Sequence, residues 1–419
     1  MISLSAFSLV TALMSLLDRL SDPQVWERFY EYKTSLACPK DFAKELRTFI
    51  DEQAYLPVCE SIRRGEPFPL PRKAVISKQS SQKKRTVYIY PRRENIVLKL
   101  LTYLLLRHYD YLFSRGLYSF RPGRSAKDAV RMLQRKLRGR RWHAYKADIS
   151  DYFNSLPVDA FLPVLREALG EDEPLFAFLS RLLSEPRVRD GREIITERKG
   201  IMAGTPLASF YANLYLKDLD AHFDDPAVPY ARYSDDVILF TETRGEAEAQ
   251  AAFIRGFLTE KGLRLNPDKE TFFRPEDGWI FLGVCCRDGV TDIAPVSLQK
   301  MKAKMRRKTR ALRRWQERNG LDEEKAAKAF IRVFNRKLFE DPGDNELSWS
   351  RWFFPVIGTA ESLQAIDRYA QDCLRYLLSG KRTKARYNVR YGELKRLGYR
   401  SLVHEYYKRE EEGNTEAKI

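Results

Sequence analysis

Two adjacent carboxylates interrupt an otherwise apolar stretch of the chain, and this limits the folds that it can adopt. Asp235 and Asp236 lie within Ala231–Phe240, where most residues are apolar or aromatic. Removing a carboxylate from water is costly unless a cation or hydrogen bonds compensate. Ser234 and Asp235 suit a tight turn, so the run predicts two short strands that turn at this point. The hairpin is either an ordinary polar tip or part of a divalent-metal site.

The composition indicates a protein with substantial cores and a polyanionic partner. The chain has 419 residues, of which 44% are hydrophobic, enough for two or three domains. Its formal net charge of +17 favours nucleic acid as the partner. A membrane surface is the competing interpretation, but no apolar run approaches the roughly 18 residues of a spanning helix. We therefore expect no membrane partner.

The cysteines and the N-terminus both favour a cytoplasmic location. Five cysteines show no paired Cys-x-x-Cys spacing, and with only four histidines we expect no zinc site. Residues Met1 to Leu20 are apolar, but they lack a basic start and a clear small-residue cleavage site. We interpret them as an amphipathic helix docked on the protein rather than as a signal peptide.

The middle of the chain shows an order of elements that favours a split β-α-β sheet. Apolar patterning predicts strand Trp142–Ile149, helices Val158–Leu169 and Pro206–Phe223, the hairpin, helix Glu246–Lys261 and strand Trp279–Cys286. Asp148 stands near the end of the first strand. Such a sheet can hold Asp148 and the Asp235/Asp236 pair on neighbouring central strands. Carboxylates placed in this way suit two Mg²⁺ ions about 4 Å apart, as in a polymerase.

Six segments in this order resemble reverse transcriptases, most closely the group II intron-like bacterial branch. They are Tyr118–Ser125, Ala147–Phe153, Gly200–Ser209, Tyr233–Asp236, Gly262–Lys269 and Phe281–Gly283. The resemblance extends from Lys73 to Cys286. It implies an α+β right-hand polymerase with fingers, a split β-α-β palm and a helical basic thumb. The expected domains are 1–72 (N-terminal helical extension), 73–290 (fingers and palm) and 291–419 (thumb).

The resemblance also implies a role for individual residues. Asp148, Asp235 and Asp236 would be the catalytic carboxylates and would bind two Mg²⁺ ions, with the Ile149 carbonyl as a further ligand. The nucleotide-binding residues would be Arg85, Phe153, Gly204 and Lys269. Phe153 would select deoxynucleotides by a clash with the 2′-hydroxyl, Arg85 would clamp the triphosphate, and Lys269 is a possible proton donor to pyrophosphate. Phe281, Leu282 and Gly283 would support the primer end.

Without the resemblance, several of these residues have a plainer interpretation. Phe153 would be a core aromatic, Arg85 a surface charge, Lys269 a solvated side chain and Phe281 part of a core strand. One departure from the family pattern stands out, because Met202-Ala203 replaces the usual Pro-Gln before Gly204. Loss of this amide side chain near the nucleotide bears on three properties of the enzyme, namely substrate discrimination, fidelity and processive copying.

The C-terminal part is strongly basic and is expected to contact nucleic acid. Lys and Arg recur throughout Gln299–Arg318 and again in Lys381–Arg400. The alternative is a solvated helix face, but the basic residues of the first segment cover nearly every face. The residues expected to bind nucleic acid are Arg121, Arg124, Lys304, Arg307 and Arg314.

These observations lead to one main functional hypothesis and two alternatives. We expect an RNA-directed DNA polymerase that uses dNTPs, an RNA template and a DNA product. Trp352–Pro355 and Gly398–Leu402 resemble the defence-associated branch, which implies a dedicated structured non-coding RNA and a role in antiphage defence. The same site could instead perform non-templated or protein-primed synthesis. A catalytically silent RNA-binding scaffold is the non-enzymatic alternative, and the oligomeric state is left open.

Overall fold

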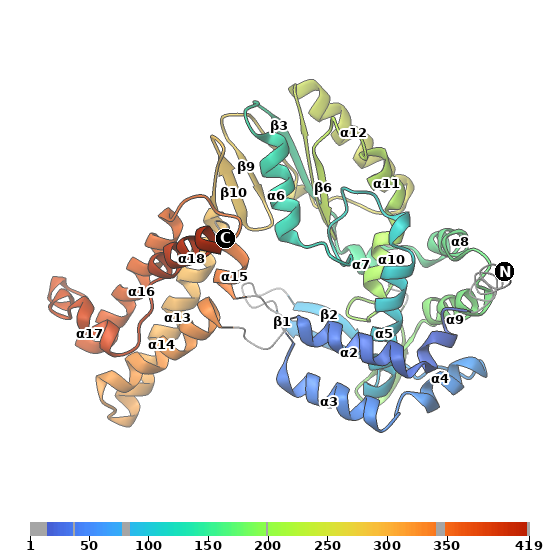
Figure 1. Ribbon diagram of the computed structural model, residues 1–419, viewed down its shortest axis with the longest axis horizontal. Helices are drawn as coiled ribbons and strands as arrows, with labels where there is room; N and C mark the ends of the chain where they lie inside the picture. Colours follow the sequence, from blue (N-terminus) through green and yellow to red (C-terminus); the bar gives the residue numbers. More distant parts are fainter. Residues whose placement is uncertain (1–14, 37, 78–83, 198–199, 341–347, 417–419) are drawn as a thin grey trace. The chain divides into compact units, whose positions relative to one another are not determined.

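The computed structural model describes residues 15–36, 38–77, 84–197, 200–340 and 348–416 (Figure 1). The chain forms two compact units, which divide between Pro275 and Glu276. The predicted N-terminal helix over Met1 to Leu20 falls mostly outside the described residues. The predicted division into three domains, with boundaries at 72/73 and 290/291, stays a prediction.

A layer of helices begins the first unit and is held together by aromatic side chains. Its elements are η1 (Asp18–Ser21), α2 (Pro23–Ser35), α3 (Lys40–Asp51), α4 (Leu56–Arg63), α5 (Arg92–His108) and η2 (Asp110–Leu112). Asp22 caps α2, because its side chain accepts a hydrogen bond of 2.8 Å from the Gln24 amide. Trp26 is fully buried and donates from its indole nitrogen to the Leu20 carbonyl at 2.8 Å. The N-terminal extension therefore packs as part of the first unit.

A four-stranded sheet lies next along the fold. Its strands, in spatial order, are β2 (Lys84–Ile89), β1 (Arg72–Ser77), β4 (Arg187–Asp190) and β5 (Glu193–Thr196). β1 and β2 are antiparallel, with Val75 opposite Thr86. β2 carries Arg85, which pairs with Ile76 of β1.

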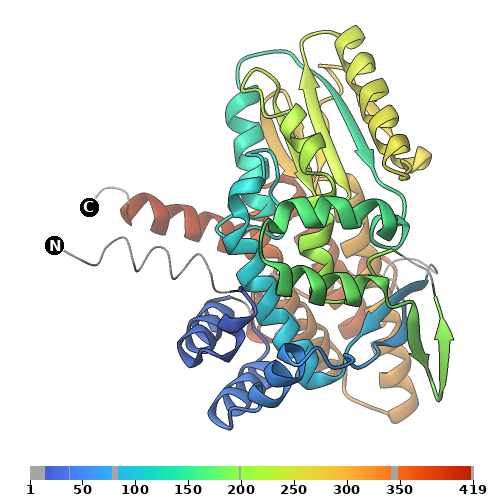
Figure 2. The same cartoon turned by 90° about the vertical axis from the view of Figure 1, so that its right-hand side faces the viewer.

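A second four-stranded sheet has the split β-α-β arrangement, but its last strand is Thr271–Phe273 and not the predicted Trp279–Cys286, which belongs to another sheet. Its strands are β6 (Tyr230–Tyr233), β7 (Asp236–Thr241), β3 (His143–Asp148) and β8 (Thr271–Phe273), in this spatial order and all antiparallel. Helix α6 (Ala126–Leu137) packs against β6, and α12 (Arg244–Glu260) packs against β3 and β7 (Figures 1 and 2). The expected α+β class with a palm-type sheet is confirmed.

The helices between β3 and β6 fill the core beside this sheet. They are α7 (Tyr152–Ser155), α8 (Val158–Leu169), α9 (Glu173–Ser184), α10 (Ala208–Tyr215) and α11 (Lys217–His222). The prediction of one helix over Pro206–Phe223 is wrong, because Leu216 interrupts it with φ −108° and ψ 18°. Almost all of α10 is buried, so its apolar pattern has no period that could reveal the interruption.

The second unit consists of a small sheet followed by helices. Its elements are β9 (Trp279–Phe281), β10 (Val284–Arg287), β11 (Val290–Ile293), α13 (Pro295–Asn319), α14 (Glu323–Phe339), α15 (Trp349–Phe353), α16 (Glu361–Ser379), η4 (Lys384–Asn388), α17 (Tyr391–Arg396) and α18 (Leu402–Glu416). The prediction of one strand over Trp279–Cys286 is wrong. Leu282 and Gly283 have φ of +49° and +83° and form a tight turn between β9 and β10.

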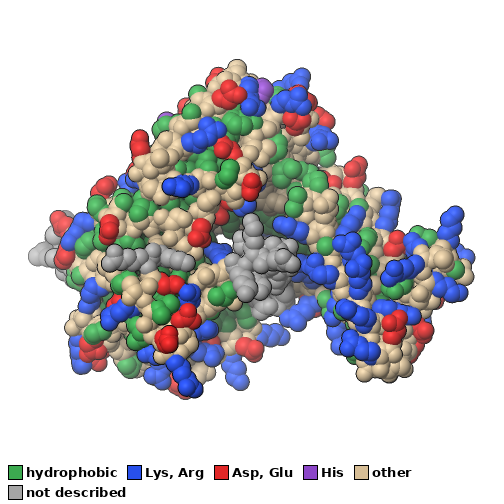
Figure 3. Space-filling model, turned by 180° about the vertical axis from the view of Figure 1, so that it is seen from behind, with side chains coloured by type: hydrophobic (Ala, Val, Ile, Leu, Met, Phe, Trp, Pro, Cys, Tyr) green, Lys and Arg blue, Asp and Glu red, His purple; other side chains and the backbone are tan. Residues whose placement is uncertain are grey.

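The second unit also carries a strongly basic helix. Ten Lys or Arg residues and one acidic residue, Glu317, lie on α13. Figure 3 shows Lys and Arg side chains gathered over the helices of this unit, on the right. Among the described residues, no helix has both the length and the apolar character that crossing a membrane requires.

Candidate active site

The register of the central strands brings the predicted carboxylates together. β3 and β7 pair so that Asp148 lies opposite Asp236, and Asp235 stands in the turn that precedes β7. The Ile149 amide donates to the Asp235 carbonyl at 3.0 Å, and the Asn266 amide donates to the Asp148 carbonyl at 2.8 Å. Backbone hydrogen bonds from three segments therefore hold the three carboxylates together at one end of the two central strands.

Two lysines balance part of the negative charge of these carboxylates. The Lys269 ammonium donates to Asp148 Oδ2 at 2.7 Å, and Lys146 Nζ lies 3.7 Å from Asp236 Oδ1. Burial raises the pKa of Asp235, and the nearby Asp148 carboxylate raises it further. Burial also raises the pKa of Asp236, while Lys146 opposes this shift. The carboxylates repel one another, so the site favours an additional cation.

The donor set fits Mg²⁺, although the side chains do not form a closed cage. No three His, Cys, Asp or Glu side chains converge closely enough to hold a metal ion by themselves in the described part of the chain. Mg²⁺ in phosphate-transfer sites takes one or two carboxylates and completes its shell with water and phosphate oxygens. Asp148, Asp235 and Asp236 supply ligands of that hard oxygen type.

A buried ion pair supports the turn that carries Asp235. The Arg232 guanidinium and the Asp220 carboxylate are both 0% exposed, and Arg232 Nε lies 2.7 Å from Asp220 Oδ1. The Tyr230 hydroxyl donates to the same oxygen at 2.8 Å. Arg232 also donates to the Ser234 carbonyl at 3.1 Å. Ser234 has φ +61°, a left-handed conformation that costs free energy unless neighbours hold it.

The segment around Ser119 supports the same turn from the other side. The Ser119 hydroxyl accepts from the Ser234 amide at 2.9 Å and donates to Asn213 Oδ1 at 3.2 Å. Asn213 returns a hydrogen bond of 2.9 Å to the Ser119 carbonyl. Sequence reasoning did not identify Asp220, Arg232 or Asn213 as part of the site. A charged residue within an apolar strand was the available signal for Arg232.

The structure also brings Phe153 and Arg85 together. The Arg85 guanidinium carbon lies 5.9 Å from the centroid of the Phe153 ring. Arg85 is exposed on β2, and Phe153 is half-buried in α7, which follows β3 directly. Burial raises the pKa of Asp235 and the charge of Arg85 opposes this shift, so this cation and the ring beside it lie near the carboxylates. Their contacts with a nucleotide stay a prediction.

The glycine-rich segment after residue 200 packs closely against β2 and α7. The Tyr88 amide donates to the Ala203 carbonyl at 2.8 Å, and Ala203 is fully buried. A Cβ atom on Gly204 would lie 3.0 Å from Val87 Cβ and 3.3 Å from the Tyr88 carbonyl, at φ +98°. Asn154 accepts from the Ala203 amide at 3.3 Å, a contact that sequence reasoning did not identify.

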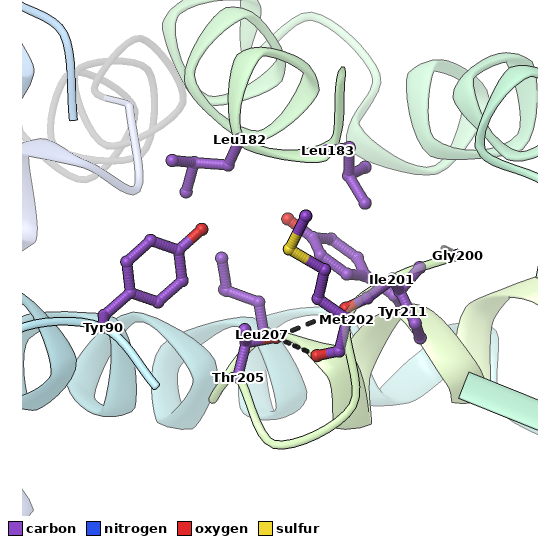
Figure 4. Close-up of a pocket in the computed structure, with 9 residues that line it drawn as sticks. All are labelled: Tyr90, Leu182, Leu183, Gly200, Ile201, Met202, Thr205, Leu207 and Tyr211. Atoms are coloured by element: carbon purple, nitrogen blue, oxygen red, sulfur yellow. Dashed lines mark hydrogen bonds between the residues drawn. The ribbon is translucent and has the colours of Figure 1, made fainter. Parts of the chain in front are cut away.

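A small cavity lies beneath this segment and is part of the core. Tyr90, Met202 and Tyr211 face it (Figure 4), and its volume is about 20 Å³. The Thr205 hydroxyl closes the local turn by donating to the Met202 carbonyl at 3.0 Å. The Tyr211 hydroxyl has no hydrogen-bond partner among the described residues. The cavity has room for one water and is far too small for a nucleotide.

Two further groups of predicted site residues belong to the second unit. Phe281, Leu282 and Gly283 form the end of the β9–β10 hairpin in the second unit, and their support of a primer end stays a prediction. Three predicted nucleic-acid contacts lie on α13, namely Lys304, Arg307 and Arg314. Arg307 and Arg314 are exposed.

Arg121 and Arg124 differ from each other. The Arg121 side chain is only 4% exposed and forms two hydrogen bonds to the Asp110 carboxylate, of 2.7 and 3.0 Å. It also donates to the Ser114 carbonyl at 2.6 Å, so its guanidinium is committed to the protein core. The prediction that Arg121 contacts nucleic acid is therefore corrected. Arg124 donates to the Arg115 carbonyl at 2.6 Å and stays a predicted contact.

Comparison with known proteins identifies the same region of the chain. Residues 76–286 match the family model described as "Reverse transcriptase (RNA-dependent DNA polymerase)". Protein YkfC of Escherichia coli K12 is 25% identical over 265 residues, which cover 54% of this chain and 68% of YkfC. The group II intron-encoded protein LtrA of Lactococcus lactis subsp. cremoris is 22% identical over 201 residues, which cover 47% of this chain and 33% of LtrA.

Two telomerase structures are also similar, at 12% identity. The apo telomerase from Candida tropicalis, truncated from its C-terminal domain, gives a TM-score of 0.44, with 54% of this chain and 55% of that chain covered. The telomerase from Candida albicans, in complex with a fragment of telomeric RNA, gives a TM-score of 0.45, with 80% and 64% covered.

Proposed function

Because the chain belongs to the reverse transcriptase family, whose description is RNA-dependent DNA polymerase, we propose that it extends a 3′-hydroxyl with dNTPs on an RNA template. The observation that carries the proposal is the register of Asp148 opposite Asp236, with Asp235 in the adjoining turn. Acidic residues on adjacent strands can act on one phosphate centre, whereas an ordinary polar hairpin needs no carboxylate on a neighbouring strand.

In this proposal the chain's own residues position the reacting groups. Bound Mg²⁺ would lower the pKa of the attacking hydroxyl and neutralise charge on the leaving pyrophosphate. Asp148, Asp235 and Asp236 would bind the ions, with the Ile149 carbonyl beside them. Lys269 holds Asp148 by a 2.7 Å hydrogen bond and would donate its proton to the pyrophosphate oxygen after release from this contact.

Selection of the nucleotide would depend on Phe153, Arg85 and Gly204. The Phe153 ring would lie under the sugar and exclude a 2′-hydroxyl. Arg85 would bind triphosphate oxygens, for which a planar guanidinium is suited. Gly204, which stands against β2 without a side chain, would let backbone and nucleotide approach each other closely.

We further propose that the template is a dedicated structured non-coding RNA and that synthesis contributes to antiphage defence. The excess of basic residues on α13 supports binding of a long polyanion in addition to a nucleotide. The resemblance of Trp352–Pro355 and Gly398–Leu402 to the defence-associated branch supports the biological role.

The test uses the full chain purified with its bound nucleic acid. With Mg²⁺ and dNTPs, the wild type should make DNA whose sequence is complementary to the co-purified RNA. A D235N/D236N variant should make none, because the metal ligands are lost while side-chain size is kept. DNA synthesis at equal rates by both proteins, or by neither, would refute the proposed activity.

The departure at Met202-Ala203 favours one alternative, non-templated or protein-primed synthesis at the same site. Ala203 is fully buried, and its methyl group carries no amide that could hydrogen-bond to a base pair. A product made from a single dNTP after nuclease removal of the RNA would support this alternative. Binding of RNA and a cellular phenotype that both survive D235N/D236N would instead identify a scaffold.

A further inference from the structure

The second unit contains a basic cavity that the function proposed above does not use. It has a volume of about 250 Å³ and is lined by residues of α13, α16 and the segment around η4. We propose that this cavity, the α13–α16 pocket, binds one unpaired nucleotide of a single-stranded nucleic acid. Its base would stack on Tyr369 or Tyr376, and Arg306, Arg310 and Arg382 would bind the adjoining phosphates.

The arginines of the pocket have charge available for a ligand. Arg306 and Arg310 stand one helical turn apart on α13, and Arg382 faces them from the chain after α16. All three are exposed. Within the described residues, no carboxylate lies within ion-pair distance of any of the three. Asp372 also lines the pocket, but its carboxylate pairs with Arg375 and Arg386. Guanidinium groups in a fork geometry suit phosphate oxygens.

The aromatic side chains give the pocket a second type of contact. Tyr369 and Tyr376 stand seven residues apart on the same face of α16, and both are half-buried. The Arg382 guanidinium carbon lies 5.3 Å from the Tyr376 ring centroid, so cation and ring are presented side by side. Bases stack on aromatic faces whatever their sequence, whereas an acidic peptide has no comparable use for them.

The walls of the pocket are fixed by contacts within the protein. Thr309 and Cys373 are buried at its base, and the Thr309 hydroxyl donates to the Met305 carbonyl at 2.8 Å. Arg386 Nη2 lies 3.6 Å from Asp372 Oδ2, and Arg386 donates to the Arg382 carbonyl at 2.8 Å. Arg386 thus links η4 to α16 and holds Arg382 at the pocket. Because its guanidinium makes these contacts, Arg386 itself is not expected to bind phosphate.

The size of the pocket decides which nucleic acid it accepts. A volume of 250 Å³ is slightly below the range of about 300–1,000 Å³ typical of small-ligand sites, so it holds a single base rather than a base pair. The pocket arginines also differ from Arg307 and Arg314, which α13 turns away from Thr309. The inference rests on the proposed function only in that polymerisation supplies single strands.

The experiment measures binding of labelled oligonucleotides to the full chain by fluorescence anisotropy. The probe is a single strand of about 12 nucleotides, oligouridylate in one arm and oligothymidylate in the other. Y369L and Y376L keep apolar bulk but remove the rings, and at least one of them should weaken binding by about 5- to 100-fold, the effect of losing one stacked base. R306Q/R310Q should reduce the slope of log K against log salt by about 0.7 for each lost phosphate contact.

Matched variants in the same unit control for charge and for ring removal. Tyr407 is 50% exposed on α18, and Arg332 is exposed on α14. Y407L and R332Q should bind as the wild type does. Photocrosslinking of a thiouridine-substituted strand should label the peptide that carries Tyr369 and Tyr376. Circular dichroism of each variant should match the wild type, which excludes unfolding as the cause of weaker binding.

The outcomes separate this inference from the proposed function. The pocket assignment is overturned if both tyrosine variants bind as tightly as the wild type. It is also overturned if binding of a duplex depends on the tyrosines to the same extent, or if polyglutamate displaces the labelled strand as well as an unlabelled strand does. Tighter binding of RNA assigns the pocket to the template, and tighter binding of DNA assigns it to the product. Tyrosine-dependent binding by a protein that makes no DNA refutes the polymerase function alone.

Discussion

Loss of the buried carboxylate of Asp220 should strongly destabilise the first unit. In the wild type this group faces Arg232, and both side chains are 0% exposed. Replacing Asp220 by Asn keeps the shape but leaves the guanidinium as an uncompensated buried charge. Breaking a buried pair in this way costs about 3–5 kcal/mol, a large part of the 5–15 kcal/mol that typically stabilises a domain.

The assay is urea denaturation of the full chain, followed by far-ultraviolet circular dichroism. With an m value of about 1–3 kcal/mol/M, the loss should move the midpoint of one transition by about 1 M or more. E248Q is the matched control, because it removes one carboxylate from the exposed pair Arg244–Glu248, whose side chains are 46% and 57% exposed. That pair joins residues four apart on a helix and contributes about 0.3–0.5 kcal/mol.

A double variant separates stability from positioning of the turn that carries Asp235. D220L/R232M removes both charges, and apolar replacement of a buried pair is often neutral or stabilising. It should therefore regain much of the lost stability, but it cannot donate to the Ser234 carbonyl. DNA synthesis by the double variant should therefore be well below that of the wild type. The reasoning is refuted if D220N costs no more than E248Q, or if the double variant is fully active.

Three further predictions concern residues near the carboxylates. F153A should raise incorporation of ribonucleotides relative to deoxynucleotides by about 10-fold or more in single-nucleotide extension, because the ring that excludes the 2′-hydroxyl is lost; an unchanged ratio contradicts this role. K269M should lower the turnover rate by about 10²-fold or more, the usual contribution of a proton donor, and a wild-type rate would exclude that role. G200A should destabilise much more than G139A in urea denaturation, because both glycines have positive φ, but only a Cβ on Gly200 would lie 2.3 Å from the Phe153 carbonyl. Equal losses, each of about 1 kcal/mol as expected for strain alone, would contradict the clash.

The sequence predicts the carboxylate site well because its signals are local. The turn at Ser234 and the strand that ends in Asp148 follow from turn chemistry and apolar patterning, and both are confirmed. The partner of Arg232 is different, because Asp220 belongs to a helix and reaches the strand only through tertiary packing. A charge in an apolar strand predicts that some partner exists, but it does not say which residue it is.

The errors have related physical causes. The interruption at Leu216 is invisible because almost every residue before it is buried and no apolar period remains. Leu282 carries no turn signal of its own, although Gly283 beside it does. Arg121 shows that composition cannot separate an exposed cation from one used inside the protein, since both increase the net charge equally.

The pairing of β3 with β7 makes catalysis a measure of correct folding. Side chains alternate between the two faces of a strand, so a shift by one residue would turn each of them to the opposite face. Asp148 would then no longer lie opposite Asp236, and the apolar side chains of the same two strands would leave their places in the core. A misaligned molecule would lose activity and stability together. The specific activity of a preparation should therefore report the fraction of molecules whose strands are in register.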